Sequence, residues 1–139
     1  MAHESTGEPT RFGYELLRDH VLPGILGKHE DDILYWAGKE IARKFPMFSI
    51  DEAPEFFKEA GWGVLTLVSS GREQADYHLS NRITSPATKD SYHLESGFLA
   101  EQFQLANGCL SECYGSRDEK TGQIVLQVRW DETFVIDKK

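Results

Sequence analysis

A chain of 139 residues with 40% hydrophobic and 27% charged residues has the length and composition of one soluble globular domain. Its 23 acidic and 15 basic residues leave a net charge of −8, which argues against binding to nucleic acid or to anionic membranes. No apolar stretch is long enough for membrane insertion and the start lacks a signal peptide, so we expect a disordered tail over 1–10, a single domain over 11–136 and a cytoplasmic location.

The first two predicted helices lie in the first 45 residues. Apolar residues recur at helical spacing over 11–22, up to Pro23-Gly24, which breaks or kinks the helix, and Gly27 ends the region. The second helix covers 31–45, begins with acidic and ends with basic side chains, and stops before a proline. Its apolar stripe, which we expect to be buried, consists of Ile33, Trp36, Ala37, Ile41 and Phe45.

A third helix is predicted over 51–60. With Asp51 as the N-cap, Pro54 falls in the first turn, where proline is tolerated; a cap at Ser49 would place it too deep in the helix. Gly61 is the natural left-handed residue after this helix, and we therefore expect it to have a positive φ.

The hydrophobic period changes from 3.6 to 2 after this glycine. Residues 64–68 are apolar on both faces, which is typical of a central strand. Residues 75–80 alternate between apolar and polar, and we expect the two segments to form an antiparallel hairpin through a turn at 69–72. A polar loop over 81–90 follows.

The segment 92–106 is predicted to be a long helix. Two adjacent lines of apolar residues run along it, so it should be buried on more than one side. Small side chains at Ser96, Gly97 and Ala100 allow another element to approach closely.

The chain ends with a second predicted hairpin, formed by 109–114 and 124–130. In its last strand the alternate residues facing one way are Ile124, Leu126, Val128 and Trp130. The order of elements predicts an α+β fold, in which three N-terminal helices pack with an antiparallel sheet of about four strands and a long helix lies between the two hairpins.

The two cysteines, Cys109 and Cys113, suit a reducing compartment. In a strand they would point to one face about 13 Å apart, at roughly 3.3 Å per residue. That distance excludes a disulfide and a shared metal ion.

The chain contains three motifs that resemble, in the same order, those of one known family, the YslB-like proteins of Bacillus and related Firmicutes. They are the segments 35–46, 59–63 and 94–102. The resemblance extends over nearly the whole chain after the tail.

The resemblance implies a fold shared with four-vinyl-reductase-type ligand-binding domains, haem-binding nitric-oxide sensors and subunits of the TRAPP tethering complex. It implies a small-molecule or interaction domain that is often dimeric, with no established reaction. The vinyl-reductase-type domains often carry cysteines in the glycine-rich stretch before the last strand. Here that stretch, 115–122, has none, which argues against a metal site like theirs.

Catalytic patterns in the sequence do not converge on one site. The glycines around Trp62 precede a strand, whereas phosphate-binding loops follow one, and Ser96-Gly97 lies within a helix rather than at a nucleophile elbow. The five histidines have no spacing that would bring two imidazoles to one ion. We therefore expect no catalytic residues, no metal site, no cofactor and no enzymatic activity.

The aromatic and apolar residues exceed what a small core needs, and some of them are candidates to line a ligand pocket. These pocket candidates are Leu17, Trp36, Ile41, Phe98 and Phe103. Glu95 and Gln102, seven residues apart on one helix face, are candidates to contact the polar end of a ligand. The alternative is that this pair satisfies the backbone or a neighbouring subunit, as buried polar groups usually do.

Two functions follow from these expectations. The first is a cytosolic, non-enzymatic domain that binds a small, mainly apolar molecule and has a regulatory or sensing role. The alternative is a dimeric scaffold without a ligand. We expect a two-fold symmetric homodimer built on helices, because one sheet face covers only one apolar line of 92–106 and the other must meet the N-terminal helices or a second subunit.

Overall fold

The structure, a computed structural model, describes residues 10–82 and 91–136. Nearly all of the predicted tail and most of the loop over 81–90 lie outside these ranges. The helices are α1 (Arg11–Glu15), α2 (Leu22–Leu26), α3 (Glu30–Lys44), α4 (Ala53–Ala60) and α5 (His93–Asn107). Short π-helical and 3-10 turns, η1 (Leu16–Val21), η2 (Gly27–His29) and η3 (Ile50–Glu52), connect or precede them. The strands are β1 (Val64–Ser70), β2 (Gln74–Ser80), β3 (Cys109–Arg117) and β4 (Ile124–Val135).

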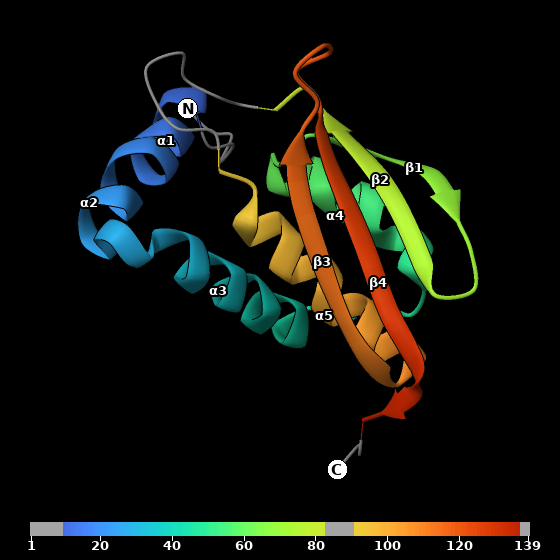
Figure 1. Cartoon of the computed structure of the whole chain (residues 1–139). Helices are drawn as coiled ribbons and strands as arrows, with labels where there is room; N and C mark the ends of the chain where they lie inside the picture. The colour runs from blue at the N-terminus through green and yellow to red at the C-terminus, as the bar shows by residue number, and fades with distance from the viewer. Residues whose placement is uncertain (1–9, 83–90, 137–139) are drawn as a thin grey trace, which may run out of the picture.

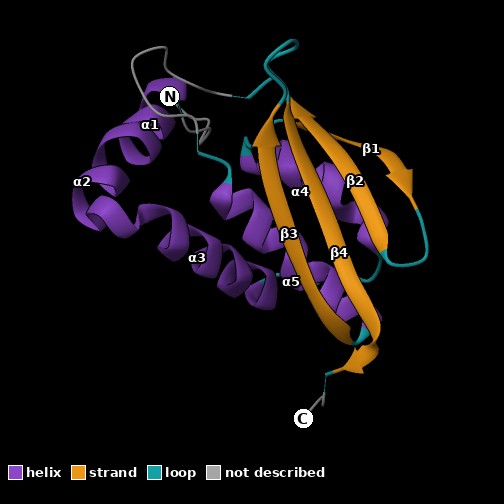
Figure 2. Cartoon of the chain, in the orientation of Figure 1, coloured by secondary structure: helices purple, strands orange, loops and turns teal. Residues whose placement is uncertain are grey.

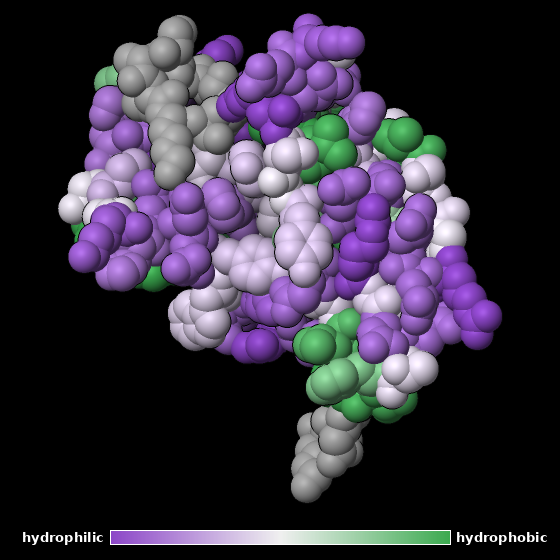
Figure 3. Space-filling view, viewed as in Figure 1, coloured by the Kyte–Doolittle hydropathy of each residue, from purple (hydrophilic) through white to green (hydrophobic). Residues whose placement is uncertain are grey.

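The four strands form one antiparallel sheet in the order β1-β2-β4-β3. Helices α4 and α5 lie against one face of this sheet, α4 beside β1 and α5 beside β3 and β4 (Figure 1). Helix α3 packs against α5, and α1 and α2 lie farther from the sheet (Figure 2). The opposite face of the sheet is mainly hydrophilic (Figure 3). The predicted α+β fold, with its two hairpins and a long helix between them, is confirmed.

Helix α5 is the centre of the core. Nine consecutive residues, Glu95 to Phe103, are buried on more than one side, as predicted, whereas Leu105 and Ala106 near the end of the helix are exposed. The alternate residues Ile124, Leu126 and Val128 of β4 are also buried, and they pack in the same core. The second apolar line of α5 packs on the N-terminal helix α3, one of the two partners predicted for it.

The backbones of α3 and α5 approach closely where they cross. An ideal Cβ built on Gly97 would lie 1.9 Å from the carbonyl oxygen of Tyr35, and one built on Gly38 would lie 2.1 Å from that of Leu94. Only glycine fits at either position, because the facing atoms belong to the main chain.

This crossing explains why the predicted buried stripe of α3 is wrong. The buried residues of α3 are Leu34, Gly38 and Ala42, whereas Trp36 and Phe45 are more than half exposed. Of the remaining predicted residues, Ile33 is exposed, and Ala37 and Ile41 are half-buried. Hydrophobic periodicity selects the face with the largest side chains, but a close crossing of backbones needs the face with the smallest.

Pro23 does not break the first helix. The chain continues through Pro23 to Leu26, and the wider π-helical turn η1 shifts the hydrogen-bond register just before the proline. A proline is tolerated in the first turn of a helix, where its missing N–H is not needed. Gly27, with φ 61°, ends the segment as predicted.

A capping box formed by Ser49 and Glu52 precedes α4, although the position of Pro54 argued against a cap at Ser49. The Ser49 hydroxyl accepts from the Asp51 N–H, and the Glu52 carboxylate accepts from the Ser49 N–H at 3.1 Å. The predicted cap at Asp51 is wrong because the first turn is the 3-10 turn η3. This turn precedes α4, so that Pro54 still falls at the start of α4.

Gly61 ends α4 in the left-handed conformation, with φ 76°, as predicted. Gly61→Ala is expected to destabilise the fold by more than about 1 kcal/mol, because alanine is strained at this backbone angle. Gly61→Asn should lose less folding stability, since asparagine tolerates the left-handed region. Urea unfolding of both variants tests this, and equal losses would contradict it.

Strand β1 is an edge strand, so its predicted central position is wrong. Of its apolar residues only Leu65 is buried, whereas Val64, Leu67 and Val68 are exposed. The hairpin with β2 is confirmed, with Leu65 opposite Leu79. An apolar run on both faces therefore does not mark a central strand in this chain.

Candidate functional site

A groove of about 650 Å³ lies where α3 ends and α4 begins. Its lining residues come from the end of α3, the connection, η3 and α4. They are Phe45, Pro46, Met47, Asp51, Glu52, Glu55, Phe56 and Glu59. The groove therefore combines an apolar set with four carboxylates.

The apolar part of the groove continues into the aromatic core. The ring centroids of Phe45 and Phe56 are 6.0 Å apart, and Phe56 stacks on Phe98 of α5 at 4.4 Å. Trp62 packs edge-on against both Phe56 and Phe98. Phe56 is thus held between the groove and the core, and a molecule in the groove would touch a ring fixed by its neighbours.

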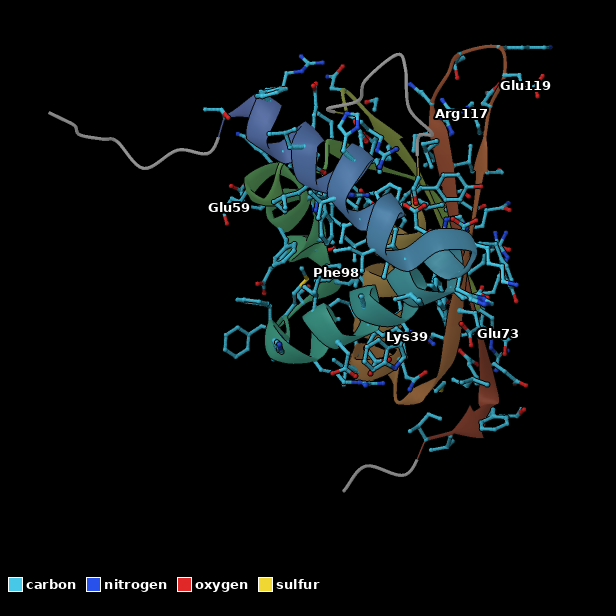
Figure 4. The ribbon with its side chains drawn as sticks, turned by 90° about the vertical axis from the view of Figure 1, so that its left-hand side faces the viewer. Lys39, Glu59, Glu73, Phe98, Arg117 and Glu119 are labelled. Atoms are coloured by element: carbon cyan, nitrogen blue, oxygen red, sulfur yellow. The ribbon has the colours of Figure 1, made fainter. Side chains whose placement is uncertain are left out.

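The four carboxylates of the groove come from η3 and α4, and the helical spacing places three of them on one side. Three of them, Glu52, Glu55 and Glu59, recur at spacings of three and four, which places them along one side of the helix. Asp51 lies beside them in η3. Figure 4 shows Glu59 projecting outward from α4, on the side of the molecule away from Glu119.

The structure does not bring the five predicted pocket residues together. Leu17 and Trp36 are 59% and 60% exposed and lie on the helical surface. Ile41 is half-buried against the core. Phe98 and Phe103 are buried in different aromatic groups, Phe98 beside Phe56 and Phe103 stacked on Trp130. None of the five lines the groove, although Phe98 supports its floor.

Sequence periodicity missed the groove residues. The signal available was a run of four acidic residues around an aromatic pair, just after a helix-ending proline. That pattern is common in exposed helix starts, and only the turn after Pro46 places Phe45 beside Phe56.

Glu95 is completely buried and is paired with two arginines. The carboxylate accepts hydrogen bonds from Arg18 at 3.2 and 3.3 Å and from Arg82 at 2.9 Å. The two guanidinium groups also donate to the carbonyl oxygen of Ser91. Arg18 in turn donates to the Tyr14 hydroxyl at 2.9 Å. This cluster joins the first helical segment, the end of the β2 hairpin and the start of α5.

Gln102 caps the end of α3. Its side-chain amide donates to the carbonyl oxygen of Phe45 at 2.9 Å and accepts from the Met47 N–H at 3.4 Å. These bonds satisfy backbone groups where the helix stops. Glu95 and Gln102 both have structural partners, which supports the alternative role for the pair, and they do not meet at one site.

A second polar contact joins α3 to the sheet. The Tyr35 hydroxyl donates to the Glu112 carboxylate and accepts from the Cys113 N–H at 3.1 Å. Burial, followed by the hydrogen bond to Glu112, raises the pKa of Tyr35 well above its ordinary value. Burial also raises the pKa of Cys113 to about 12. Both groups stay protonated near neutral pH, so this thiol is a poor nucleophile.

The described ranges, 10–82 and 91–136, contain neither a metal-binding cluster nor a membrane-spanning helix. No group of three or more His, Cys, Asp or Glu side chains there is arranged to hold a metal ion. None of the helices in these ranges has the length and hydrophobicity of a membrane span.

Comparison with solved structures defines the fold class. The chain superposes on a vinyl-4-reductase family protein from Methanocaldococcus jannaschii with a TM-score of 0.61 and 18% identity, covering 92% of this chain and 85% of that one. A more distant similarity, with a TM-score of 0.40 and 12% identity, relates it to an Fe(II) unliganded H-NOX protein from K. algicida, covering 85% of this chain and 61% of that one.

The sequence comparisons show the family. The model of the family described as protein of unknown function DUF2507 matches residues 11–129, and the chain belongs to this family. It is 43% identical over 128 residues to the uncharacterized protein YslB of Bacillus subtilis (strain 168), covering 89% of this chain and 86% of that protein. The predicted YslB-like resemblance is confirmed.

Proposed function

We propose that this domain binds a small, mainly apolar molecule in the groove between α3 and α4, and acts in the cytoplasm as a sensor or regulator rather than as an enzyme. The observation that carries the proposal is the groove itself, with Phe45 and Phe56 on its apolar side and Phe98 behind them. Its volume of about 650 Å³ lies within the range of small-molecule sites, roughly 300–1,000 Å³.

A sensing role is supported by the contacts behind the groove. Phe56 contacts Phe98, which lies next to Gly97 at the crossing of α3 and α5. A ligand that shifts the Phe56 ring would act beside the close crossing of α3 and α5. Packed interiors transmit such shifts, because they are dense and have few voids.

The test is a thermal-unfolding series with small aromatic amphiphiles such as 4-phenylbutanol. A ligand that binds only the native state at 100 times its dissociation constant adds about 2.7 kcal/mol of stability, which corresponds to a rise of several degrees in Tm. Phe45→Ala should weaken binding about tenfold, because it removes one aromatic wall of the groove.

Phe48→Ala is the matched control. Phe48 is fully exposed three residues along the chain and does not line the groove, so its loss should leave affinity unchanged. A flat melting response across a chemically varied panel would contradict the proposal, as would equal loss of binding in the two variants.

The second candidate function is a homodimeric scaffold, favoured by an exposed apolar surface on the N-terminal helices. These helices face the reader in Figure 4. The exposed residues are Phe12, Leu16, Leu17, Val21, Ile25, Ile33 and Trp36. The π-helical turn η1 adds one residue between Leu16 and Val21, which aligns Val21 and Ile25 with the preceding apolar residues. A standard interface buries roughly 800 Å² per partner, so a dimer would have to cover most of these side chains.

Light scattering at micromolar concentration tests this candidate. The expected result is the mass of two chains for the wild type and of one chain for Ile25→Glu. Val68→Glu, on the exposed edge strand β1, should leave the dimer intact. A wild-type mass of one chain would exclude the dimeric scaffold. If Val68→Glu dissociates the dimer and Ile25→Glu does not, the interface is formed by the edge strand β1 and not by the N-terminal helices.

A further inference from the structure

We infer that the ligand of the groove carries a positive charge beside its apolar body, as an aromatic or alkyl amine does. The inference rests on the proposed function, because it concerns the same groove. Among the described residues that line the groove, all four ionisable ones are carboxylates, and none is a lysine, arginine or histidine. An anionic ligand such as a fatty acid would meet like charges at the rim.

The carboxylates are available to a ligand. Glu52 is engaged by the Ser49 N–H in the capping box. The carboxylates of Asp51, Glu55 and Glu59 form no ion pair or hydrogen bond with any residue in 10–82 or 91–136. Three negative charges therefore border one apolar surface, and no basic side chain of the described ranges lies within ion-pair distance of them.

Helix stability accounts for only part of this arrangement. Asp51, Glu52 and Glu55 lie at the start of α4, where negative charge complements the helix dipole. Glu59 lies in the last turn, where the dipole disfavours a carboxylate, and it is four residues from Glu55, a spacing at which like charges repel. A bound cation would relieve both effects, and this makes Glu59 the residue whose position the fold alone does not explain.

The aromatic walls suit the same ligand. Cations are attracted to the faces of aromatic rings, and Phe45 and Phe56 line the groove together with Glu55 and Glu59. The end of α3 also reaches the groove at Phe45, and the C-terminal end of a helix carries partial negative charge. Charge and apolar surface thus favour one class of molecule, a small amphipathic cation.

The experiment compares three probes with one phenylbutyl body: 4-phenylbutylamine, 4-phenylbutanol and 4-phenylbutyrate. Calorimetric titration at low salt is expected to show the amine binding about tenfold more tightly than the alcohol, since two or three exposed ion pairs contribute roughly that much. The butyrate should bind more weakly than the alcohol. The preference for the amine should fall as salt is added.

The variant Glu55→Gln/Glu59→Gln should remove most of the preference for the amine, because two of the three unpaired carboxylates are lost, while alcohol binding is kept. Glu59→Gln alone should show part of this loss. Glu119→Gln, which removes one negative charge from the distant hairpin loop between β3 and β4, is the matched control and should keep the full preference (Figure 4).

The outcomes separate the two proposals. Equal affinity for amine and alcohol, or a preference that is undiminished in Glu55→Gln/Glu59→Gln, would overturn the cationic ligand and leave the apolar groove in place. Failure of all three probes to bind would overturn the proposed function and the cationic ligand with it. Because the substituted glutamates are exposed, all three variants should unfold at wild-type or higher temperature, and thermal unfolding of the same samples can show this.

Discussion

Gly97→Ala is expected to remove about 3 kcal/mol or more of folding free energy, a large part of the roughly 5–15 kcal/mol that holds a domain together. The added methyl carbon would lie 1.9 Å from the carbonyl oxygen of Tyr35, and the facing atoms are backbone that no side-chain rotation can move. Helix α3 would have to shift away from α5 and open the core. Urea unfolding followed by circular dichroism measures the loss.

Gly24→Ala is the control for this substitution. A Cβ at Gly24 meets nothing within 4 Å, and the residue lies in α2. Alanine there should leave stability unchanged or raise it by about 0.5–1 kcal/mol, because glycine is the poorer helix former. If Gly97→Ala unfolds at the same urea concentration as Gly24→Ala, the close crossing of α3 and α5 does not exist in solution.

Glu95→Gln is expected to cost about 3–5 kcal/mol, the range found when one partner of a buried ion pair is removed. The carboxylate is completely buried and receives hydrogen bonds from both Arg18 and Arg82. The amide is neutral and offers one acceptor oxygen in place of two, so both buried guanidinium groups lose their charged partner. Denaturant unfolding reports the difference directly.

Glu132→Gln provides the comparison. Glu132 pairs with Arg72 at 2.8 Å, but both side chains are exposed, and such pairs contribute little. No measurable change in stability is expected. A loss of similar size in the two variants would mean that Glu95 is solvated in solution.

Local patterns in the sequence predicted the elements well. The helix over 92–106, the two hairpins and the left-handed Gly61 all depend on neighbours within a few residues, and the structure confirms them. The α+β arrangement followed from the order of these elements.

The errors concern features set by distant parts of the chain. The buried face of α3 is selected by Gly97, nearly sixty residues away, so periodicity within α3 could not identify it. The edge position of β1 depends on β4 pairing with β2 on one side and with β3 on the other. Neither is encoded in the local pattern of apolar residues.

The candidate site was harder to predict than the fold. Its apolar part is created by Phe45 and Phe56 meeting across the turn after Pro46, and its charge by an ordinary helix start. The partners of Glu95 lie 77 and 13 residues away in sequence. The sequence showed that Glu95 and Gln102 were unusual for an apolar helix, but their arginine and backbone partners became visible only in three dimensions.

The burial of the central part of α5, residues 95–103, also determines how the domain folds. A helix whose central residues have no water-facing side has little stability of its own, so α5 cannot persist until α3, earlier in the chain, and β3 and β4, later in it, have packed around it. The two halves of the chain are therefore not separable folding units. Amide protons of α3, α5 and the central strands should exchange together, through global unfolding alone.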